Sequence, residues 1–203
     1  MKLYGGPRSP YFRKARVVLE EKGIPYQIER MVPVPKTPEL LALHPMGKIP
    51  ILRDGDVVVP DSSVICAYLE RVQPVPALYP QDAAQFAAAL FLEEYSDTRM
   101  GEIIGGINFE TFVKPQILHQ QPDLARAGEF RARLAEIYDY LESRLSADRE
   151  WLLGRFTIAD VGVGAHLQGL VFCDEKIDPA RWPRTAAYRR AVEARPSFKT
   201  AIG

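Results

Sequence analysis

The sequence has few of the residues on which several classes of protein depend. It contains only two cysteines, Cys66 and Cys173, so it has no disulfide framework. Its three histidines, His44, His119 and His166, do not have the spacing of metal ligands. We therefore interpret these histidines as structural or surface residues and expect no metal site.

The sequence also lacks an excess of charge of either sign. Lys and Arg together number 26, and so do Asp and Glu, which gives a formal net charge of zero. This balance argues against nucleic acid as a partner. Four basic residues do cluster early, at Arg8, Arg13, Lys14 and Arg16. We interpret them as a solvated helix face with some preference for an anionic ligand.

Long apolar segments are missing as well. No uninterrupted apolar run approaches the ~18 residues that a transmembrane helix requires, so we expect no membrane partner. The chain does not start with a charged and then apolar leader, which favours a cytoplasmic location. Its 203 residues suffice for one large or two small domains.

The stretch from Leu3 to Leu19 is the most informative part of the chain. A short apolar start meets Gly5-Gly6-Pro7, which predicts a strand followed by a turn. Ser9 then precedes Pro10, and Ser at the N-cap with Pro in the first turn is typical of a helix start. Free N–H groups at such a helix start favour an anion or a thiolate. Ser9 is therefore either an ordinary capping residue or part of a site.

The rest of the first third alternates between strand and helix patterns. We expect an α/β unit with a mixed four-stranded sheet and helices on its faces, because strand–helix–strand units come early and a hairpin comes late. The hairpin is indicated by Asp54-Gly55. The expected strands are 3–4, 24–29, 48–52 and 57–59, and the expected helices are 10–22, 39–43 and 62–72.

The remainder of the chain carries only helical patterns, which predicts an all-α bundle. A helix beginning at Asp82 should bend or break near the glycines of 101–106. A second helix is expected over 130–145, and a last one over 185–194, ended by Pro196. Between them, Thr157 and Asp160 form a capping-box variant, so we assign Asp160 a structural role.

Four segments together resemble the cytosolic glutathione transferases. They are the Ser-Pro-aromatic start of the first helix, HPMGKIPIL, PDSSVICAYL, and the FTIADV segment of the second half. The resemblance implies a thioredoxin-like domain over 1–73, a linker over 74–81, and an all-α domain over 82–203. It also implies a serine-type enzyme, of a class that we do not assign, that uses glutathione as co-substrate and forms a homodimer.

The resemblance further implies a site for glutathione around Ser9. The Ser9 hydroxyl would hold the sulfur as a thiolate, and Tyr4 is the alternative for this role. A cis Ile49–Pro50 bond would present the backbone of Ile49 to the cysteinyl part. Other glutathione contacts, at the γ-glutamyl and glycyl ends, would come from Asp61, Ser62, Lys48 and Lys36. Candidate walls of the electrophile site between the domains are Tyr11, Phe12, Tyr95, Arg99, Phe109 and Phe112.

Three functions remain open at this point. The first is a transferase that conjugates glutathione to hydrophobic electrophiles, as in detoxification. The second is a glutathione-fold protein that binds partners or regulates with little turnover, because fold alone does not determine function. The third is a glutathione-dependent peroxidase, dehalogenase or isomerase. The sequence does not identify the electrophile.

Overall fold

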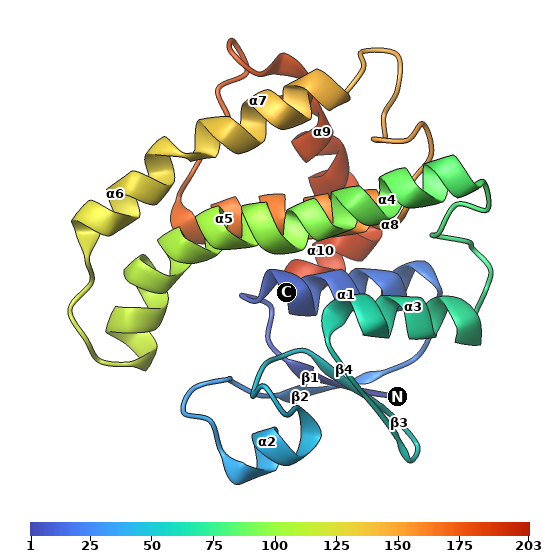
Figure 1. The fold of residues 1–203 in the computed structure, drawn as a ribbon, viewed down its shortest axis with the longest axis vertical. Coiled ribbons are helices and arrows are strands. Elements are labelled where there is room, and N and C mark those ends of the chain that lie inside the picture. Colours follow the sequence, from blue (N-terminus) through green and yellow to red (C-terminus); the bar gives the residue numbers. More distant parts are fainter.

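The computed structural model describes residues 1–203, and its first third is built around a mixed sheet (Figure 1). The strands are β1 (Lys2–Gly5), β2 (Gln27–Arg30), β3 (Ile51–Asp54) and β4 (Val57–Pro60), in the order β2-β1-β3-β4. The helices of this part are α1 (Pro10–Glu21), α2 (Pro38–Leu43) and α3 (Ser62–Val72). The predicted order of strands and helices is confirmed, although β2 and β3 each begin three residues later than expected.

The pairing of the strands decides which loops meet. β1 runs parallel to β2 and antiparallel to β3, and β3 runs antiparallel to β4. Tyr4 lies opposite Ile51, which lies opposite Pro60. The end of β1, the start of β3 and the end of β4 therefore share one edge of the sheet, which also holds the end of β2.

Helices make up the remainder of the chain, as predicted. They are α4 (Ala83–Tyr95), the π-helix η1 (Ser96–Met100), α5 (Gly101–Asn108), the π-helix η2 (Phe109–Ile117), α6 (Leu124–Ala132), α7 (Leu134–Arg144), α8 (Ile158–Leu167), the 3₁₀-helix η3 (Gln168–Cys173), α9 (Pro183–Ala194) and α10 (Pro196–Ile202). This all-α half and the thioredoxin-like half together confirm the predicted fold class.

The glycines after α4 serve packing rather than breaking the helix. The run from α4 to η2 stays helical, and its irregular segment η1 ends just before Gly101. A Cβ atom on Gly106 would lie 2.5 Å from the ring of Phe130, so glycine here permits α6 to approach α5 closely. The expected break is therefore replaced by a local change of helix type.

Two other boundaries differ from the prediction. The single helix expected over 130–145 is divided into α6 and α7 at Arg133. Pro196 does end α9, but it also begins α10, which the sequence pattern did not predict. Proline suits a first helical turn because the N–H that it lacks would have no partner there.

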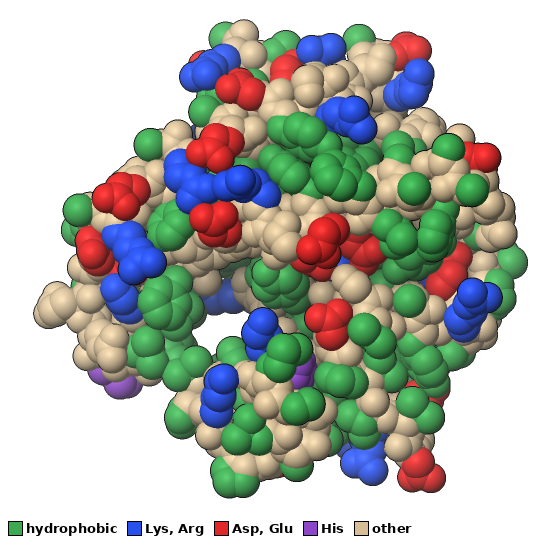
Figure 2. All heavy atoms as spheres, viewed as in Figure 1, with side chains coloured by type: hydrophobic (Ala, Val, Ile, Leu, Met, Phe, Trp, Pro, Cys, Tyr) green, Lys and Arg blue, Asp and Glu red, His purple; other side chains and the backbone are tan.

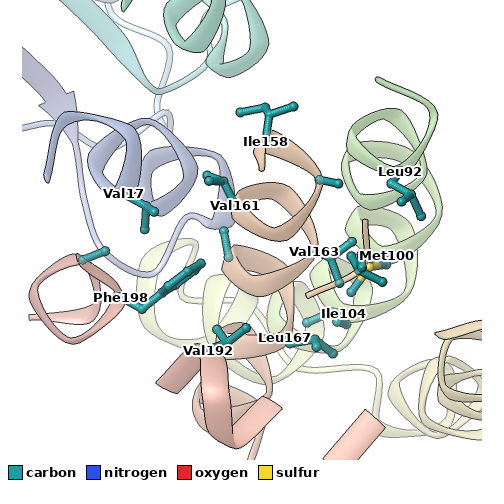
Figure 3. Packing of buried hydrophobic residues seen from close by; sticks show 14 of the residues in the cluster. Val17, Leu92, Met100, Ile104, Ile158, Val161, Val163, Leu167, Val192 and Phe198 are labelled. Atoms are coloured by element: carbon teal, nitrogen blue, oxygen red, sulfur yellow. The ribbon is translucent and has the colours of Figure 1, made fainter. Parts of the chain in front are cut away.

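α8 is the centre of the helical half, and all ten of its residues are buried. Figure 3 shows its apolar side chains between α1 and α10 on one side and α4, η1 and α5 on the other. The predicted capping box of Thr157 and Asp160 is present at its start. None of the helices combines the length and hydropathy needed to cross a membrane.

Candidate functional site

Four segments that carry the predicted site residues leave the sheet at the same edge. The loop to α1 follows β1, the loop to α2 follows β2, the turn before β3 carries 48–50, and the start of α3 follows β4. The topology thus brings together one segment from each strand. The N-termini of α1 and α3 also lie here, and both direct positive dipole ends toward the same region.

Ser9 is the N-cap of α1 and is half-buried. Its Oγ accepts a hydrogen bond of 3.3 Å from the N–H of Phe12, and Pro10 occupies the first turn. Because the oxygen only accepts in this bond, its own proton remains free to be donated to another group. Ser9 therefore combines a helix N-terminus with a free O–H donor.

Tyr4 lies in a different place. Leu3 and Gly5 are buried on one face of β1, so Tyr4 between them points to the other face. There it lines a shallow surface hollow with Tyr26 and Arg53. This is the face that α1 does not cover, so the side chains of Tyr4 and Ser9 belong to different regions.

The Ile49–Pro50 peptide bond is cis, the form that the resemblance implied. Pro50 is buried, whereas Ile49 is half-buried and precedes β3. Ile49 takes part in none of the backbone hydrogen bonds that lie outside the helices and strands. Its N–H and C=O groups are therefore left for a ligand at the sheet edge.

Asp61 and Ser62 begin α3. Asp61 is the N-cap, with a positive φ of 78°, and its Oδ1 accepts from the N–H groups of Ser63 at 2.9 Å and Val64 at 3.3 Å. Such a strained backbone in a non-glycine residue is common at functional sites. Ser62 is almost completely buried, and its hydroxyl makes no hydrogen bond within the protein. Asp61 therefore orders the turn at the start of α3.

Lys36 and Lys48 lie beside the same turn. Both are exposed, and the aliphatic chain of Lys36 passes over Gly47, where a Cβ would lie 2.8 Å from its Cδ. Gly47 also has a positive φ of 61°. Glycine at position 47 therefore lets the Lys36 side chain approach the neighbourhood of Lys48, which makes this rim of the site positive.

A buried ionic network ties the start of α3 to the helical half. The ammonium of Lys14 lies 2.7 Å from Glu93 Oε1 and 2.6 Å from Asp97 Oδ2. It also donates to Ser63 Oγ at 2.7 Å, and Ser63 in turn donates to Asp97 Oδ2 at 3.0 Å. The turn of Asp61 is thus held against α1, α4 and η1 by charged groups out of water.

This network corrects the interpretation of the early basic cluster. Arg13 and Lys14 are completely buried and do not form a solvated face. The Arg13 guanidinium donates twice to the carbonyl of Ala165 and once to that of Pro7. No local pattern shows this burial, because Ala165, Glu93 and Asp97 lie far along the chain from Arg13 and Lys14.

Arg8 is a residue that the sequence analysis did not place in the site. Its guanidinium lies 3.4 Å from the ring centroid of Phe112 and 4.7 Å from that of Phe172. Its Nη2 also contacts Asn108 Oδ1 and the Phe172 carbonyl, both at 3.4 Å. Because Arg8 directly precedes Ser9, these contacts join the loop of Ser9 to α5, η2 and η3.

Three of the predicted electrophile-site residues lie elsewhere. Phe12 is completely buried in the core, where its ring packs under Gly5, so it cannot line an accessible wall. Tyr95 faces α7, with its ring 4.4 Å from that of Tyr140. Arg99 pairs with Glu102 and with Glu136 on the exposed surface.

The other three stay near the domain junction. The Tyr11 hydroxyl donates to the carbonyl of Asp97 at 2.8 Å, and Phe112 covers the Arg8 guanidinium. Phe109 is exposed at the start of η2. Figure 2 shows an opening between the η2 end of the helical half and the α2 side of the sheet half.

Three further titratable side chains, those of His166, Cys66 and Cys173, are buried. His166 is buried, and burial lowers its pKa to about 4, so it is neutral at pH 7. Burial raises the pKa of the Cys66 thiol and that of Cys173, the latter to about 11. No group of three or more His, Cys, Asp or Glu side chains is arranged to hold a metal ion.

Comparison with known families decides the relationship of the chain. The family model described as "Glutathione S-transferase, N-terminal domain" matches residues 3–82, and that described as "Glutathione S-transferase, C-terminal domain" matches residues 82–191. The chain belongs to the glutathione S-transferase family. The predicted resemblance is therefore confirmed, and with it a glutathione transferase or transferase-like function.

Relatives of this glutathione S-transferase include both enzymes and a protein with another name. Glutathione S-transferase 3 of Zea mays is 31% identical over 100% of this chain and 93% of its own. FtsZ-localized protein A of Caulobacter vibrioides is 29% identical over 81% of this chain and 75% of its own. A solved glutathione S-transferase from Rhodospirillum rubrum superposes with a TM-score of 0.90 at 28% identity, covering 98% of this chain and 90% of the other.

Proposed function

We propose that this protein conjugates glutathione to hydrophobic electrophiles, with Ser9 holding the sulfur of glutathione as a thiolate. The observation that carries the proposal is the free O–H of Ser9 at the N-terminus of α1. A thiolate attacks electrophiles and a thiol does not, so a donor and a helix dipole that favour the ionised form accelerate the reaction. The thiol proton leaves to solvent, and the protein needs no general base.

The other groups at the sheet edge suit the rest of the tripeptide. Ile49 has a free N–H and C=O for the cysteinyl backbone, in the manner of a short added strand. The free hydroxyl of Ser62 at the start of α3 suits the γ-glutamyl carboxylate. Asp61 suits the neighbouring ammonium, and Lys48 and Lys36 suit the glycyl carboxylate.

A pair of variants tests the role of Ser9. Ser9→Ala is expected to lower kcat/KM with a neutral electrophile by about a hundredfold. A loss of this size is typical when one preorganised hydrogen-bond donor to an anion, here the glutathione thiolate, is removed. It should also raise the pKa of bound glutathione, measured by ultraviolet absorbance of the thiolate. Tyr4→Phe should keep wild-type kinetics. Near-full activity in Ser9→Ala would remove Ser9 from this role, and a loss in Tyr4→Phe would transfer it to Tyr4.

Calorimetry with glutathione tests the binding site independently of the reaction. The wild-type protein and Ser9→Ala should both bind glutathione, since Ser62 and Ile49 remain in place. A Ser62→Ala variant should bind more weakly, by about tenfold for one hydrogen bond to a charged group. Absence of binding to the wild-type protein would reject every glutathione-dependent reaction.

A second function is favoured by one relative. FtsZ-localized protein A shares the fold and 29% identity, and its name refers to its localisation rather than to a transferase activity. A protein that binds glutathione or a partner with little turnover would bind in calorimetry and show no activity with a panel of electrophiles and hydroperoxides. The same panel separates transfer from peroxidase, dehalogenase or isomerase activity.

We also propose a homodimer of two-domain subunits, divided at 1–73, 74–81 and 82–203, in the cytoplasm. Support for the dimer comes from apolar side chains left exposed on neighbouring helices of the two halves. They are Val64 and Val72 on α3, and Phe86, Leu90 and Phe91 on α4. Figure 2 shows apolar side chains at this end of the molecule. Sedimentation of the wild-type protein and of Phe91→Glu tests the assembly, which the variant should weaken.

A further inference from the structure

The guanidinium of Arg8 is a cation without an anionic partner. Phe112 and Phe172 lie against it, and its only hydrogen bonds run from Nη2 to two neutral oxygens. Both of these bonds are 3.4 Å long, beyond the range of strong hydrogen bonds. Its Nε is buried and has no hydrogen-bond partner at all. Several N–H donors of one charged group are therefore unused.

The surroundings of Arg8 add positive charge rather than removing it. Arg13, which is completely buried, lies with its guanidinium 5.3 Å from the same Phe172 ring. Its partners are backbone carbonyls, and no carboxylate acts on either arginine. Burial lowers the pKa of Arg8; only the Cys173 thiol acts to raise it, and no carboxylate does so. An uncompensated, partly desolvated cation favours an anionic ligand.

Arg8 also lies on the appropriate side of Ser9. It precedes Ser9 directly, and its contacts are with Asn108, Phe112 and Phe172 of the helical half. The cations proposed for glutathione, Lys36 and Lys48, lie on the α2 side of the opening. Arg8 thus faces the part of the junction that is left for the second substrate.

We propose that the electrophile of this glutathione S-transferase carries a carboxylate, and that the Arg8 guanidinium binds it beside the rings of Phe112 and Phe172. This inference rests on the proposed transfer reaction. A guanidinium offers paired N–H donors that match the two oxygens of a carboxylate. The rings of Phe112 and Phe172 beside the guanidinium suit a planar, conjugated substrate.

A matched pair of substrates tests the proposal. In 4-chloro-3-nitrobenzoate and 4-chloro-3-nitrobenzamide, the sulfur of glutathione forms a bond to the ring carbon while the bond to chlorine breaks. Chloride leaves with the electron pair in both reactions. The two substrates differ in the carboxylate, and each kcat/KM is divided by the uncatalysed rate constant with glutathione. The wild-type enzyme should prefer the benzoate.

Three variants locate the preference. In Arg8→Met the benzoate-to-benzamide ratio should fall by about tenfold or more, as expected for a charged hydrogen-bonded pair. Arg8→Lys should retain part of the benzoate-to-benzamide ratio, because lysine keeps the positive charge but lacks the paired N–H donors of the guanidinium. Arg53→Met is the control for lost charge, since Arg53 is exposed on β3 and bonds only to Gly55. Its ratio should match that of the wild-type enzyme.

Other outcomes would overturn the proposal. An equal loss with both substrates in Arg8→Met would mean that Arg8 only joins the two halves. A rise of the glutathione Kd in this variant, with an unchanged ratio, would assign the anion to glutathione itself. If neither substrate reacts and calorimetry detects no binding of glutathione, the transfer function is rejected as well. Equal normalised rates with the two substrates in the wild-type enzyme would reject only the carboxylate preference.

One measurement requires no variant and so does not depend on folding of Arg8→Met. The wild-type enzyme is inhibited with 3-nitrobenzoate and with 3-nitrobenzamide, which lack the leaving group. The benzoate should inhibit at a concentration about tenfold lower. Equal inhibition by the two compounds would reject the proposal.

Discussion

Lys14 of α1 and Asp97 of η1 form an ion pair of 2.6 Å that joins the thioredoxin-like half to the helical half. The Lys14 side chain has no exposed surface, and Glu93 is a second acidic partner at 2.7 Å. Burial of charges is costly, and their mutual attraction offsets this cost only while every partner is present. The junction between the two halves is therefore sensitive to loss of this single cation.

Lys14→Met is expected to lower the free energy of unfolding by about 3–5 kcal/mol, because two carboxylates lose their buried partner. Urea unfolding measures the change. Lys2→Met is the control, since Lys2 forms an exposed pair with Glu29 and its loss should change the stability little. Glu93→Gln should cost less than Lys14→Met, because Asp97 still pairs with the lysine. Equal losses in Lys14→Met and Lys2→Met would contradict this account.

Adjacent glycines in α5 provide a second, internally matched test. Gly106→Ala should destabilise the protein by about 1–3 kcal/mol, because its Cβ would lie 2.5 Å from the Phe130 ring. Gly105 has no atom within 4 Å of a Cβ built on it. Gly105→Ala should therefore stabilise the helix by about 0.5–1 kcal/mol through helix propensity. Thermal unfolding of both variants checks the signs, and a common sign would refute the packing argument.

The predictable part of this structure is the part encoded by local sequence. Asp54-Gly55 predicts the hairpin, Ser9-Pro10 predicts the start of α1, and Thr157 with Asp160 predicts the start of α8. Each of these signals acts within a few residues, so periodicity and capping chemistry suffice.

The unpredictable part depends on contacts between distant segments. Burial of Lys14 requires Glu93 and Asp97, which lie about 80 residues away in the chain, and no local pattern shows this. The contact of Arg8 with Phe172 is similar. The contact of Tyr95 with α7 is also not encoded locally, because an apolar helix offers several faces and packing decides which one meets α7.

Glu142 of α7 provides a prediction about pH. Burial acts to raise its pKa. Hydrogen bonds from the backbone and side chains of Thr185 and Arg184 outweigh this effect and lower the pKa to about 2. A depressed pKa in the folded state means that Glu142 stabilises the protein above its unfolded pKa, near 4.5. This contribution should be lost as the pH falls from about 4.5 to about 2.

Glu142→Gln tests this dependence. The variant should lose about 1–3 kcal/mol of stability at pH 7 and should show a flatter decline below pH 4.5 than the wild-type protein. Urea unfolding at a series of pH values measures both effects. Glu136→Gln, at an exposed pair with Arg133, should keep the wild-type pH profile. A wild-type profile in Glu142→Gln would show that the group does not stabilise the start of α9.

Asp160 accepts four hydrogen bonds at the start of α8, which predicts a structural rather than a catalytic role. The donors are the N–H of Leu152, the N–H and hydroxyl of Thr157, and the hydroxyl of Tyr188. Asp160→Ala should lower the free energy of unfolding by about 2–4 kcal/mol, because buried donors lose their acceptor. Tyr188→Phe removes one of the four and should cost about 1 kcal/mol.

The affinity for glutathione separates the structural role from a catalytic one. Asp160 lies in the helical half, away from the sheet edge that carries Ser9 and Ser62. Below the unfolding transition of Asp160→Ala, its Kd for glutathione in calorimetry should therefore equal that of the wild-type protein. A large rise in Kd while the variant remains folded would place Asp160 in communication with the site and contradict a purely structural role.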